Sequence, residues 1–318
     1  MKLHFSTDAE PGIRRIRSGK GFRYETPAGR SPSERDVARI RALAIPPAYH
    51  DVWISVDPES YLQATGRDAK GRKQYRYHPA WTSVRSETKY HRMGDFGRAL
   101  PHMRWHVSTD LERKELTHEK VLATIVYLLE HVLIRVGNDE YAKENHSYGL
   151  TTLEDKHVVT HGDNVLFRFR GKSGVHHEVA MHDHRVAKVI RACQDLPGQR
   201  LFEYRDDSGA IRHIGSADVN AYIHSIAGND FTAKDYRTWG GTVSCCAFLR
   251  KIDVPSTERA AAKCVTKAIE AVADRLGNTV AVCRKSYIHP AIPSAFLDGA
   301  LHRTKGPTED VVLSVIAR

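Results

Sequence analysis

Cysteine is scarce in this sequence, and motifs that bind metal through cysteine and histidine are absent. Its 318 residues include five cysteines and no C-x-x-C pair, so neither a disulfide framework nor a zinc ribbon is indicated. The nineteen histidines form no H-E-x-x-H motif, and His176-His177 and His182-x-His184 have no cysteine partner. We expect no metal site, and we expect a chain that works in a reducing cytoplasm.

Long apolar runs and a nucleotide-binding loop are also missing. Residues 1–18 are polar and rich in arginine, unlike the apolar segment of a signal peptide. The most apolar stretch, residues 121–136, contains charged side chains and is too short to cross a bilayer. The GKS sequence at 171–173 lacks the glycine that a P-loop has five residues earlier, because position 166 is leucine. We therefore expect no membrane insertion and no use of ATP.

What the sequence has in excess is positive charge. Lys and Arg number 48 against 38 Asp and Glu, which gives a net charge of +10. Residues 1–90 contain 17 basic and 10 acidic side chains (+7), whereas residues 91–318 contain 31 and 28 (+3). A positive field favours polyanionic partners, and nucleic acid is the first candidate. Charge alone does not separate a DNA-binding protein from a ribosomal or membrane-surface protein.

Residues 1–90 are predicted to form a small mixed β domain. Strands are expected at 21–25, 52–56 and 61–65, and one helix is expected after Pro32 with Ser33 as its N-cap. The last strand leads into the sequence GRDAKGRKQYRYH, which is a solvated basic hairpin or a surface for phosphates and base edges. Its candidate DNA contacts are Arg67, Lys70, Arg72, Lys73, Tyr75, Arg76 and Tyr77.

Residues 91–318 are predicted to form a larger, mostly helical domain, which makes the fold class α+β. A helix is expected at 117–136, where apolar residues form one stripe and Gly137 can supply the C-cap. An apolar period of two between 157 and 181 predicts three short antiparallel strands. Further helices are expected at 184–194, 216–226, 236–250 and 256–276, the last ending at Gly277.

Five side chains in this second part could carry chemistry on a phosphodiester: Arg135, Lys172, Arg237, Asn278 and Tyr287. Each of them alone has a structural explanation, such as an ion pair, a solvated turn, close packing or a helix end. Together, two arginines, a lysine, an amide and a tyrosine are the groups that metal-free transesterification at phosphorus needs.

The sequence around these residues resembles the active-site pentad of type IB DNA topoisomerases, in the bacterial, poxvirus-like branch. The likeness rests on Arg135, on Lys172, on KDYRTW around Arg237, and on LGNTVAVCRKSYIHP around Asn278 and Tyr287. These elements stand in the family's order, and GRDAKGRKQYRYH belongs to the same likeness. It covers nearly the whole chain.

The resemblance implies the fold shared by tyrosine recombinases and type IB topoisomerases, with two domains that form a C-shaped clamp around duplex DNA. It implies relaxation of supercoiled DNA through a 3′-phosphotyrosyl intermediate, without metal, ATP or another cofactor. By resemblance, Tyr287 is the nucleophile, Lys172 is the general acid, and Arg135, Arg237 and Asn278 bind the phosphate. The protein is then expected to be a bacterial monomer, cytoplasmic and associated with the nucleoid.

Two positions depart from the family's pattern. The poxvirus enzymes have histidine where Asn278 stands, which leaves a hydrogen-bond donor but removes a charged imidazolium. Val280 stands where proline is expected, which removes a rigid helix start but no functional group. We expect a weaker contribution from Asn278 and little consequence at Val280.

Two other functions stay open from the sequence. Tyrosine recombinases share the fold and the covalent chemistry, but they usually carry His-x-x-Arg where this chain has Lys234 three residues before Arg237. They also exchange a C-terminal segment, and only about thirty residues follow Tyr287. A non-catalytic, basic architectural DNA-binding protein would explain the charge but not the ordered pentad.

Overall fold

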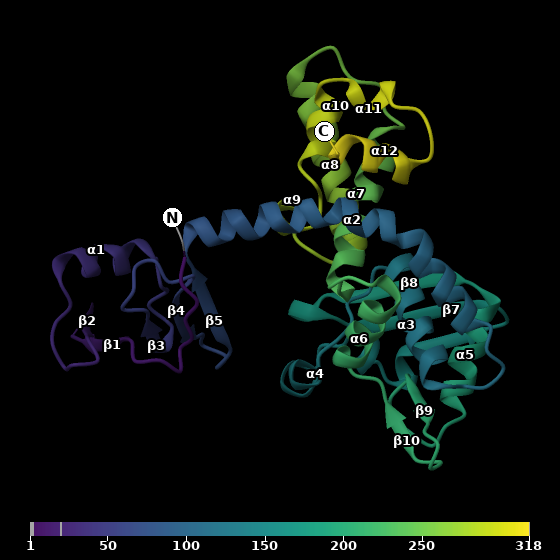
Figure 1. The fold of residues 1–318 in the computed structure, drawn as a ribbon, viewed down its shortest axis with the longest axis horizontal. Helices are drawn as coiled ribbons and strands as arrows, with labels where there is room; N and C mark the ends of the chain where they lie inside the picture. The colour runs from purple at the N-terminus through teal and green to yellow at the C-terminus, as the bar shows by residue number, and fades with distance from the viewer. Residues whose placement is uncertain (1–2, 20, 318) are drawn as a thin grey trace. The chain divides into compact units, whose positions relative to one another are not determined.

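The structure, a computed structural model, describes residues 3–19 and 21–317, and within them all side chains except those of residues 82–88, 91 and 141. The chain divides into two compact units, Met1–Lys89 and Tyr90–Arg318, where the sequence placed a boundary at residue 90. The first unit is built on an antiparallel sheet and the second is mostly helical (Figure 1). The predicted α+β class is confirmed.

A five-stranded antiparallel sheet with the order β2-β1-β3-β4-β5 forms the N-terminal unit (Figure 1). Its elements are β1 (Ile13–Ser18), β2 (Gly21–Glu25), α1 (Glu34–Ala42), β3 (His50–Ile54), β4 (Leu62–Arg67) and β5 (Lys73–Tyr77). Ser33 caps α1 as predicted, because its hydroxyl accepts a hydrogen bond of 3.1 Å from the Asp36 amide. The sequence missed β1, whose isoleucines are spaced by three rather than two.

Helix α1 covers one face of this sheet. Ile13, Ile54 and Ala64 are paired across neighbouring strands and therefore point to the same side. They are buried together with Ile40 of α1. This small apolar core fixes the sheet against the helix.

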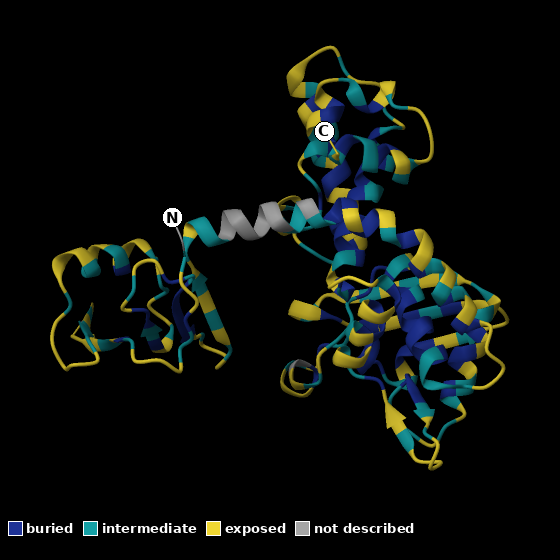
Figure 2. Cartoon of the chain, viewed as in Figure 1, coloured by how far each residue is buried: buried dark blue, intermediate teal, exposed yellow. Residues whose placement is uncertain are grey.

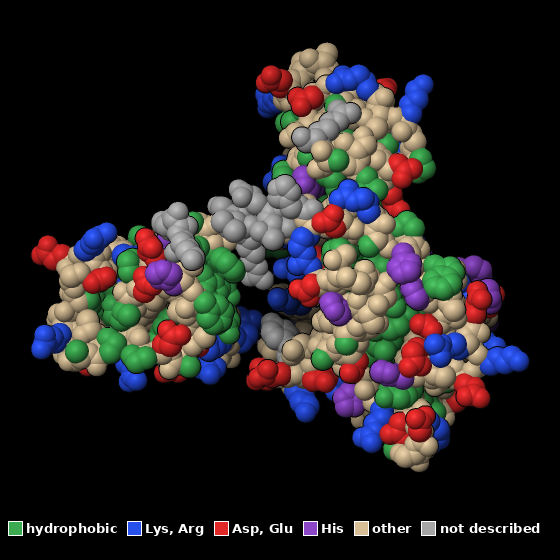
Figure 3. All heavy atoms as spheres, viewed as in Figure 1, with side chains coloured by type: hydrophobic (Ala, Val, Ile, Leu, Met, Phe, Trp, Pro, Cys, Tyr) green, Lys and Arg blue, Asp and Glu red, His purple; other side chains and the backbone are tan. Residues whose placement is uncertain are grey.

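The opposite face, which we call the open face, carries Arg14, Trp53, Thr65 and Tyr75. These residues pair with one another across β1, β3, β4 and β5, and they alternate with the core residues along each strand. In the space-filling view, hydrophobic side chains gather over the β4–β5 edge of the unit (Figure 3). The open face thus combines aromatic and cationic side chains.

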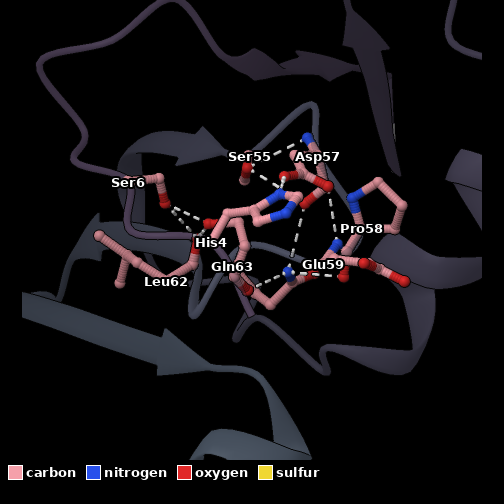
Figure 4. A network of polar contacts seen from close by, with 9 residues as sticks. His4, Ser6, Ser55, Asp57, Pro58, Glu59, Leu62 and Gln63 are labelled. Carbon is pink, nitrogen blue, oxygen red and sulfur yellow. Dashed lines mark hydrogen bonds and ion pairs between the residues drawn. The ribbon is translucent and has the colours of Figure 1, made fainter. Parts of the chain in front are cut away.

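A network of polar contacts ties the segment before β1 to the turn between β3 and β4 (Figure 4). His4 Nδ1 lies 2.8 Å from Asp57 Oδ2, and the hydroxyls of Ser6 and Ser60 share a hydrogen bond. Gln63, which is buried, donates from Nε2 to the Ser60 carbonyl at 2.7 Å. Buried polar groups are stable only when they are paired in this way.

The helix α2 (Pro79–Leu111) begins in the first unit and continues into the second. The second unit then contains α3 (His118–His131), α4 (Asp139–Asn145), β6 (Val158–His161), β7 (Asn164–Arg170), β8 (His176–His182), α5 (His184–Gln194), β9 (Glu203–Arg205), β10 (Ile211–His213), α6 (Ser216–Ala227), α7 (Ala233–Leu249), α8 (Glu258–Leu276), α9 (Val280–Ser286), α10 (Ala291–Leu297), α11 (Ala300–Arg303) and α12 (Thr308–Ile316).

Helix α3 lies in the core of this unit, and most of its apolar side chains are buried (Figure 2). Thr117 caps its start, since its hydroxyl accepts a hydrogen bond of 3.3 Å from the Lys120 amide. The strands β6, β7 and β8 form the predicted three-stranded antiparallel sheet. Helix α8 ends as predicted at Gly277, which has a left-handed φ of 58°.

The helix predicted at 117–136 was wrong in its C-terminal part, because α3 ends at His131. Leu133 adopts a left-handed φ of 56°, which a continuing helix does not allow. Arginines from other helices take the carbonyls at this end: Arg275 donates to His131 O at 3.1 Å, and Arg237 donates to Leu133 O. Arg135 therefore stands on an irregular segment after the helix.

Within the part of the chain that the structure describes, no helix has the length and apolarity needed to span a membrane. The same residues contain no group of three or more His, Cys, Asp or Glu side chains that could hold a metal ion.

Candidate active site

Tyr287 stands at the C-terminal end of α9 and serves as its C-cap. Thr279 caps the other end and accepts a hydrogen bond of 3.3 Å from the Val282 amide. The amide of Tyr287 donates to the Cys283 carbonyl at 2.9 Å, which closes the last turn. The short helix thus holds Tyr287 between two defined ends, and its half-buried ring packs against the core.

Arg237 is buried in α7, with 4% of its surface exposed, and it organises two of the segments around it. One terminal nitrogen donates to Leu133 O, and the other donates to Leu276 O at 2.7 Å. These carbonyls lie two residues before Arg135 and two before Asn278. The guanidinium carbon lies 5.3 Å from the centre of the Tyr287 ring. Arg237 therefore fixes the chain on which its partners stand.

Arg135 and Asn278 contact each other directly. Arg135 Nη2 donates to Asn278 Oδ1 at 2.6 Å. Because a guanidinium can only donate, the amide oxygen must face it and the amide nitrogen must point elsewhere. Among the described residues, Asn278 Nδ2 and Arg237 Nε are both buried without a hydrogen-bond acceptor. Two unpaired buried donors at one site are suited to an anion.

Lys172 stands in the turn that joins β7 to β8. The turn is closed by hydrogen bonds from Gly171 N to Val175 O at 2.7 Å and from Gly174 N to Gly171 O at 3.0 Å. Lys172 is exposed and has no ion-pair partner in the described part of the chain. Arg168, earlier on β7, is paired with Glu178 at 3.0 Å.

Two cavities bring all five predicted residues together. One has a volume of about 460 Å³, and its lining includes Arg135, Lys172, Arg237 and Tyr287. The other has a volume of about 520 Å³ and is lined by Arg135, Lys172, Asn278 and Tyr287 among others. The two cavities adjoin, because they share Arg135, Lys172 and Tyr287. Four residues from separate stretches of chain thus meet around the tyrosine.

The cations at this site favour the anionic form of the tyrosine. Burial raises the pKa of Tyr287, but the positive charges of Arg237, Arg135 and Lys234 outweigh burial, so the pKa falls below its ordinary value. Burial and the nearby charge of Arg135 lower the pKa of Arg237 to about 10, which leaves it protonated at neutral pH. The site therefore combines a tyrosine hydroxyl that ionises more readily than usual with arginines that stay positively charged.

His177, which was considered from the sequence only as a metal ligand, lies beside this site. A Cβ atom at Gly171 would lie 2.6 Å from its ring, and one at Gly277 would lie 2.3 Å from it. The ring therefore occupies the space between the chain before Lys172 and the chain before Asn278. Burial, together with the charges of Arg135 and Arg237, lowers the pKa of His177 and keeps the ring neutral. Nothing in the sequence indicates that Gly171 and Gly277 lie near the same histidine, and only the fold brings them together.

The predicted DNA contacts of the N-terminal unit fall on different sides of its sheet. Tyr75 lies on the open face, and Lys73 and Arg67, which pair with each other, alternate to the same side. Tyr77 stacks on Tyr75 with 6.1 Å between ring centres. Lys73 also forms an ion pair of 2.5 Å with Asp8.

Arg72, Arg76 and Lys70 are placed differently. Arg72 forms an ion pair with Asp68 at 2.7 Å, and Lys70 lies in the same exposed turn. Arg76 pairs with Ala64 on the face that α1 covers. Arg14, which the sequence analysis did not select, is exposed and lines a hollow of about 540 Å³ on the open face. Strand alternation around Ile13 is the signal that could have identified it.

Models of two protein families match the chain. One is described as eukaryotic DNA topoisomerase I, catalytic core, and it matches residues 78–296. The other is described as bacterial DNA topoisomerase IB, N-terminal domain, and it matches residues 21–68. The first covers more than half of the chain, and the two matches together extend over both units.

Individual relatives of the chain are also named as DNA topoisomerases. A DNA topoisomerase 1B of Acanthamoeba polyphaga mimivirus is 32% identical over 285 residues, which are 87% of this chain and 85% of the relative. A DNA topoisomerase 1B of vaccinia virus strain Copenhagen is 23% identical over 84% of this chain and 82% of its own length. A DNA topoisomerase 1 of Schizosaccharomyces pombe is 23% identical over 44% of this chain and 17% of its own.

Proposed function

The chain belongs to the family of type IB DNA topoisomerases, isomerases that act on DNA, and we propose that Tyr287 cleaves one strand through a 3′-phosphotyrosyl intermediate. The tyrosine recombinase and the non-catalytic DNA-binding protein, open from the sequence, are set aside by this membership. In our proposal Lys172 is the general acid, and Arg135, Arg237 and Asn278 bind the phosphate.

One observation carries this assignment of roles: a tyrosine of lowered pKa lies beside buried donors that an anion can satisfy. Asn278 Nδ2 and Arg237 Nε are buried without acceptors among the described residues, and Arg135 adds a guanidinium beside them. A phosphodiester supplies acceptor oxygens of the required charge. The terminal nitrogens of Arg237 each keep a second N–H after donating to the backbone carbonyls.

Cleavage begins when Tyr287 loses its phenolic proton to solvent and attacks phosphorus in line. Negative charge then grows on the non-bridging oxygens, where fixed donors stabilise the transition state. Removal of one such donor typically slows a reaction by ~10²–10³-fold. Arg237 needs no rearrangement at this moment, because its backbone hydrogen bonds already hold it.

The bond from phosphorus to the 5′ oxygen breaks as the bond to the tyrosine oxygen forms. The electron pair goes to the 5′ oxygen, and Lys172 supplies the proton that makes it a hydroxyl. The exposed turn between β7 and β8 suits a side chain that must reach the leaving oxygen. In the reverse step the 5′ hydroxyl returns its proton to Lys172 and attacks phosphorus. The bond from phosphorus to the Tyr287 oxygen breaks, Tyr287 leaves as the phenolate, and the strand is resealed without ATP.

Relaxation of plasmid DNA tests the proposal. We expect supercoiled plasmid without any special site to be relaxed in the presence of EDTA and in the absence of ATP. We also propose that the enzyme acts as a cytoplasmic monomer, so the initial rate should rise in proportion to protein concentration. Dependence on a divalent metal would contradict the proposed chemistry, and a rate that rises with the square of concentration would contradict the monomer.

We further propose that the open face of the N-terminal sheet contacts DNA phosphates. The double variant Arg14→Ala/Arg67→Ala should weaken DNA binding and reduce the slope of log K against log salt by roughly 1 for each phosphate that the protein no longer neutralises. The measurement is fluorescence anisotropy of a duplex over a salt series. Arg41→Ala is the matched control, because Arg41 is an exposed arginine of α1 on the other side of the sheet. Equal slopes for the double variant and the wild type would contradict this surface.

A further inference from the structure

The carbonyls that flank Tyr287 need partners from outside their own helix. Helix α9 ends at Ser286, and the last carbonyl groups of any helix lack intrahelical donors. A nucleophile must also stand within a small distance of its in-line position, because misplacement by about 1 Å can cost ~10²-fold in rate. A group that donates a hydrogen bond to these carbonyls therefore affects the rate at which Tyr287 attacks phosphorus.

Tyr90 of α2 supplies a donor to two of them. Its hydroxyl lies 3.0 Å from Lys285 O and 3.1 Å from Ile288 O, so the single O–H is shared between carbonyls on either side of Tyr287. The Tyr90 ring meets the His289 ring edge to face at 4.9 Å. The half-buried phenol, whose pKa burial raises, remains a donor at neutral pH.

Helix α7 holds the same segment from its own side. Thr242, which is fully buried, accepts a hydrogen bond of 3.0 Å from the His289 amide and lies 3.4 Å from Tyr287 O. Gly241 permits this approach, because a Cβ atom there would lie 2.7 Å from Tyr287 O. Tyr90 and helix α7 thus hold residues 285–289 from two different elements.

We propose that Tyr90 is a positioning residue through which α2 holds the nucleophile for in-line attack. This inference rests on the proposed function of Tyr287 and extends it to a residue outside the pentad. Tyr90 is also the first residue of the second unit, on the helix that begins at Pro79 in the N-terminal unit. The segment that carries the nucleophile is thus tied by hydrogen bonds to a continuous element that leads out of its own unit.

The test is single-turnover cleavage by Tyr90→Phe, which keeps the ring and removes the hydroxyl. With saturating full-length protein and a duplex whose cleaved end diffuses away, we expect the cleavage rate to fall about ten-fold. The Kd for DNA, measured by anisotropy, should not change, because Tyr90 is proposed to bind backbone carbonyls of the protein and not DNA. The amides of residues 285–289 should exchange hydrogen faster than in the wild type.

Tyr222→Phe is the matched control. The Tyr222 hydroxyl also bonds α2, donating to Asp110 at 2.7 Å, but far along the helix from the nucleophile. We expect it to lower the melting temperature while the cleavage rate and exchange at 285–289 stay at wild-type values. Equal cleavage rates for Tyr90→Phe and wild type would overturn the inference, as would an equal loss in both variants. Failure of the wild type to form any covalent complex would instead overturn the proposed role of Tyr287.

Discussion

Tyr287→Phe is expected to abolish both the covalent protein–DNA complex and plasmid relaxation, while DNA binding stays within about two-fold of the wild type. The substitution removes the atom that attacks phosphorus and keeps the ring that packs against the core. The cations that would bind the phosphate, Arg135 and Arg237, remain in place through contacts that do not involve the phenol oxygen. The variant should therefore lose DNA cleavage and keep DNA binding.

Trapping with denaturant measures the covalent protein–DNA complex, and fluorescence anisotropy measures DNA binding. Labelled duplex is incubated with protein, quenched with detergent and separated by electrophoresis, and the label on each strand end shows that the adduct carries the 3′ phosphate. Tyr204→Phe is the control, because Tyr204 lies on β9, outside the cavity lining. A covalent adduct of normal yield in Tyr287→Phe would assign the nucleophile to another residue.

The five candidate residues could be selected from the sequence because they lie in short motifs in a fixed order, yet the contacts between them could not be predicted. Arg237 donates to carbonyls two residues before Arg135 and Asn278, which are remote from it in sequence. The weak point of the prediction, Asn278, is clarified by the same geometry. Arg135 orients the amide and leaves its nitrogen as an unpaired donor in the described structure.

The end of α3 shows what hydrophobic periodicity cannot decide. Val132, Leu133 and Ile134 are all buried, so the apolar stripe continues although the helix stops. The stop depends on Arg275 and Arg237, which reach the carbonyls of His131 and Leu133 from other helices. Long-range capping of this kind leaves no trace in the local sequence.

In the basic hairpin at residues 66–78, by contrast, the alternation of side chains along a strand could have been used to divide the candidate residues. Residues that alternate along β5 point to opposite faces, so Tyr75 and Arg76 cannot serve one surface. The density of charge in GRKQYRYH drew attention to the whole segment. The alternation itself separates Lys73 and Tyr75 on the open face from Arg76 on the side of α1.

Lys172→Ala is expected to slow cleavage of ordinary DNA by ~10²–10⁴-fold, the usual contribution of a general acid. The leaving 5′ alkoxide is strongly basic, since a hydroxyl of this type has a pKa near ~16, as water does. It cannot depart quickly unless a proton arrives as the bond to phosphorus breaks. Lys172 is the exposed cation that lines both cavities and lacks an ion-pair partner among the described residues.

A substrate with sulfur in place of the 5′ oxygen separates proton donation from other roles of Lys172. A thiolate leaves without a proton, because a thiol has a pKa near ~8.5. Lys172→Ala should therefore cleave the sulfur substrate within about ten-fold of the wild type, in single-turnover reactions with saturating protein. Arg168→Ala is the matched control on the same hairpin, because Arg168 is already paired with Glu178, and it should cleave both substrates at normal rates. If Lys172→Ala slows both substrates equally, Lys172 stabilises charge on the phosphate and another group donates the proton.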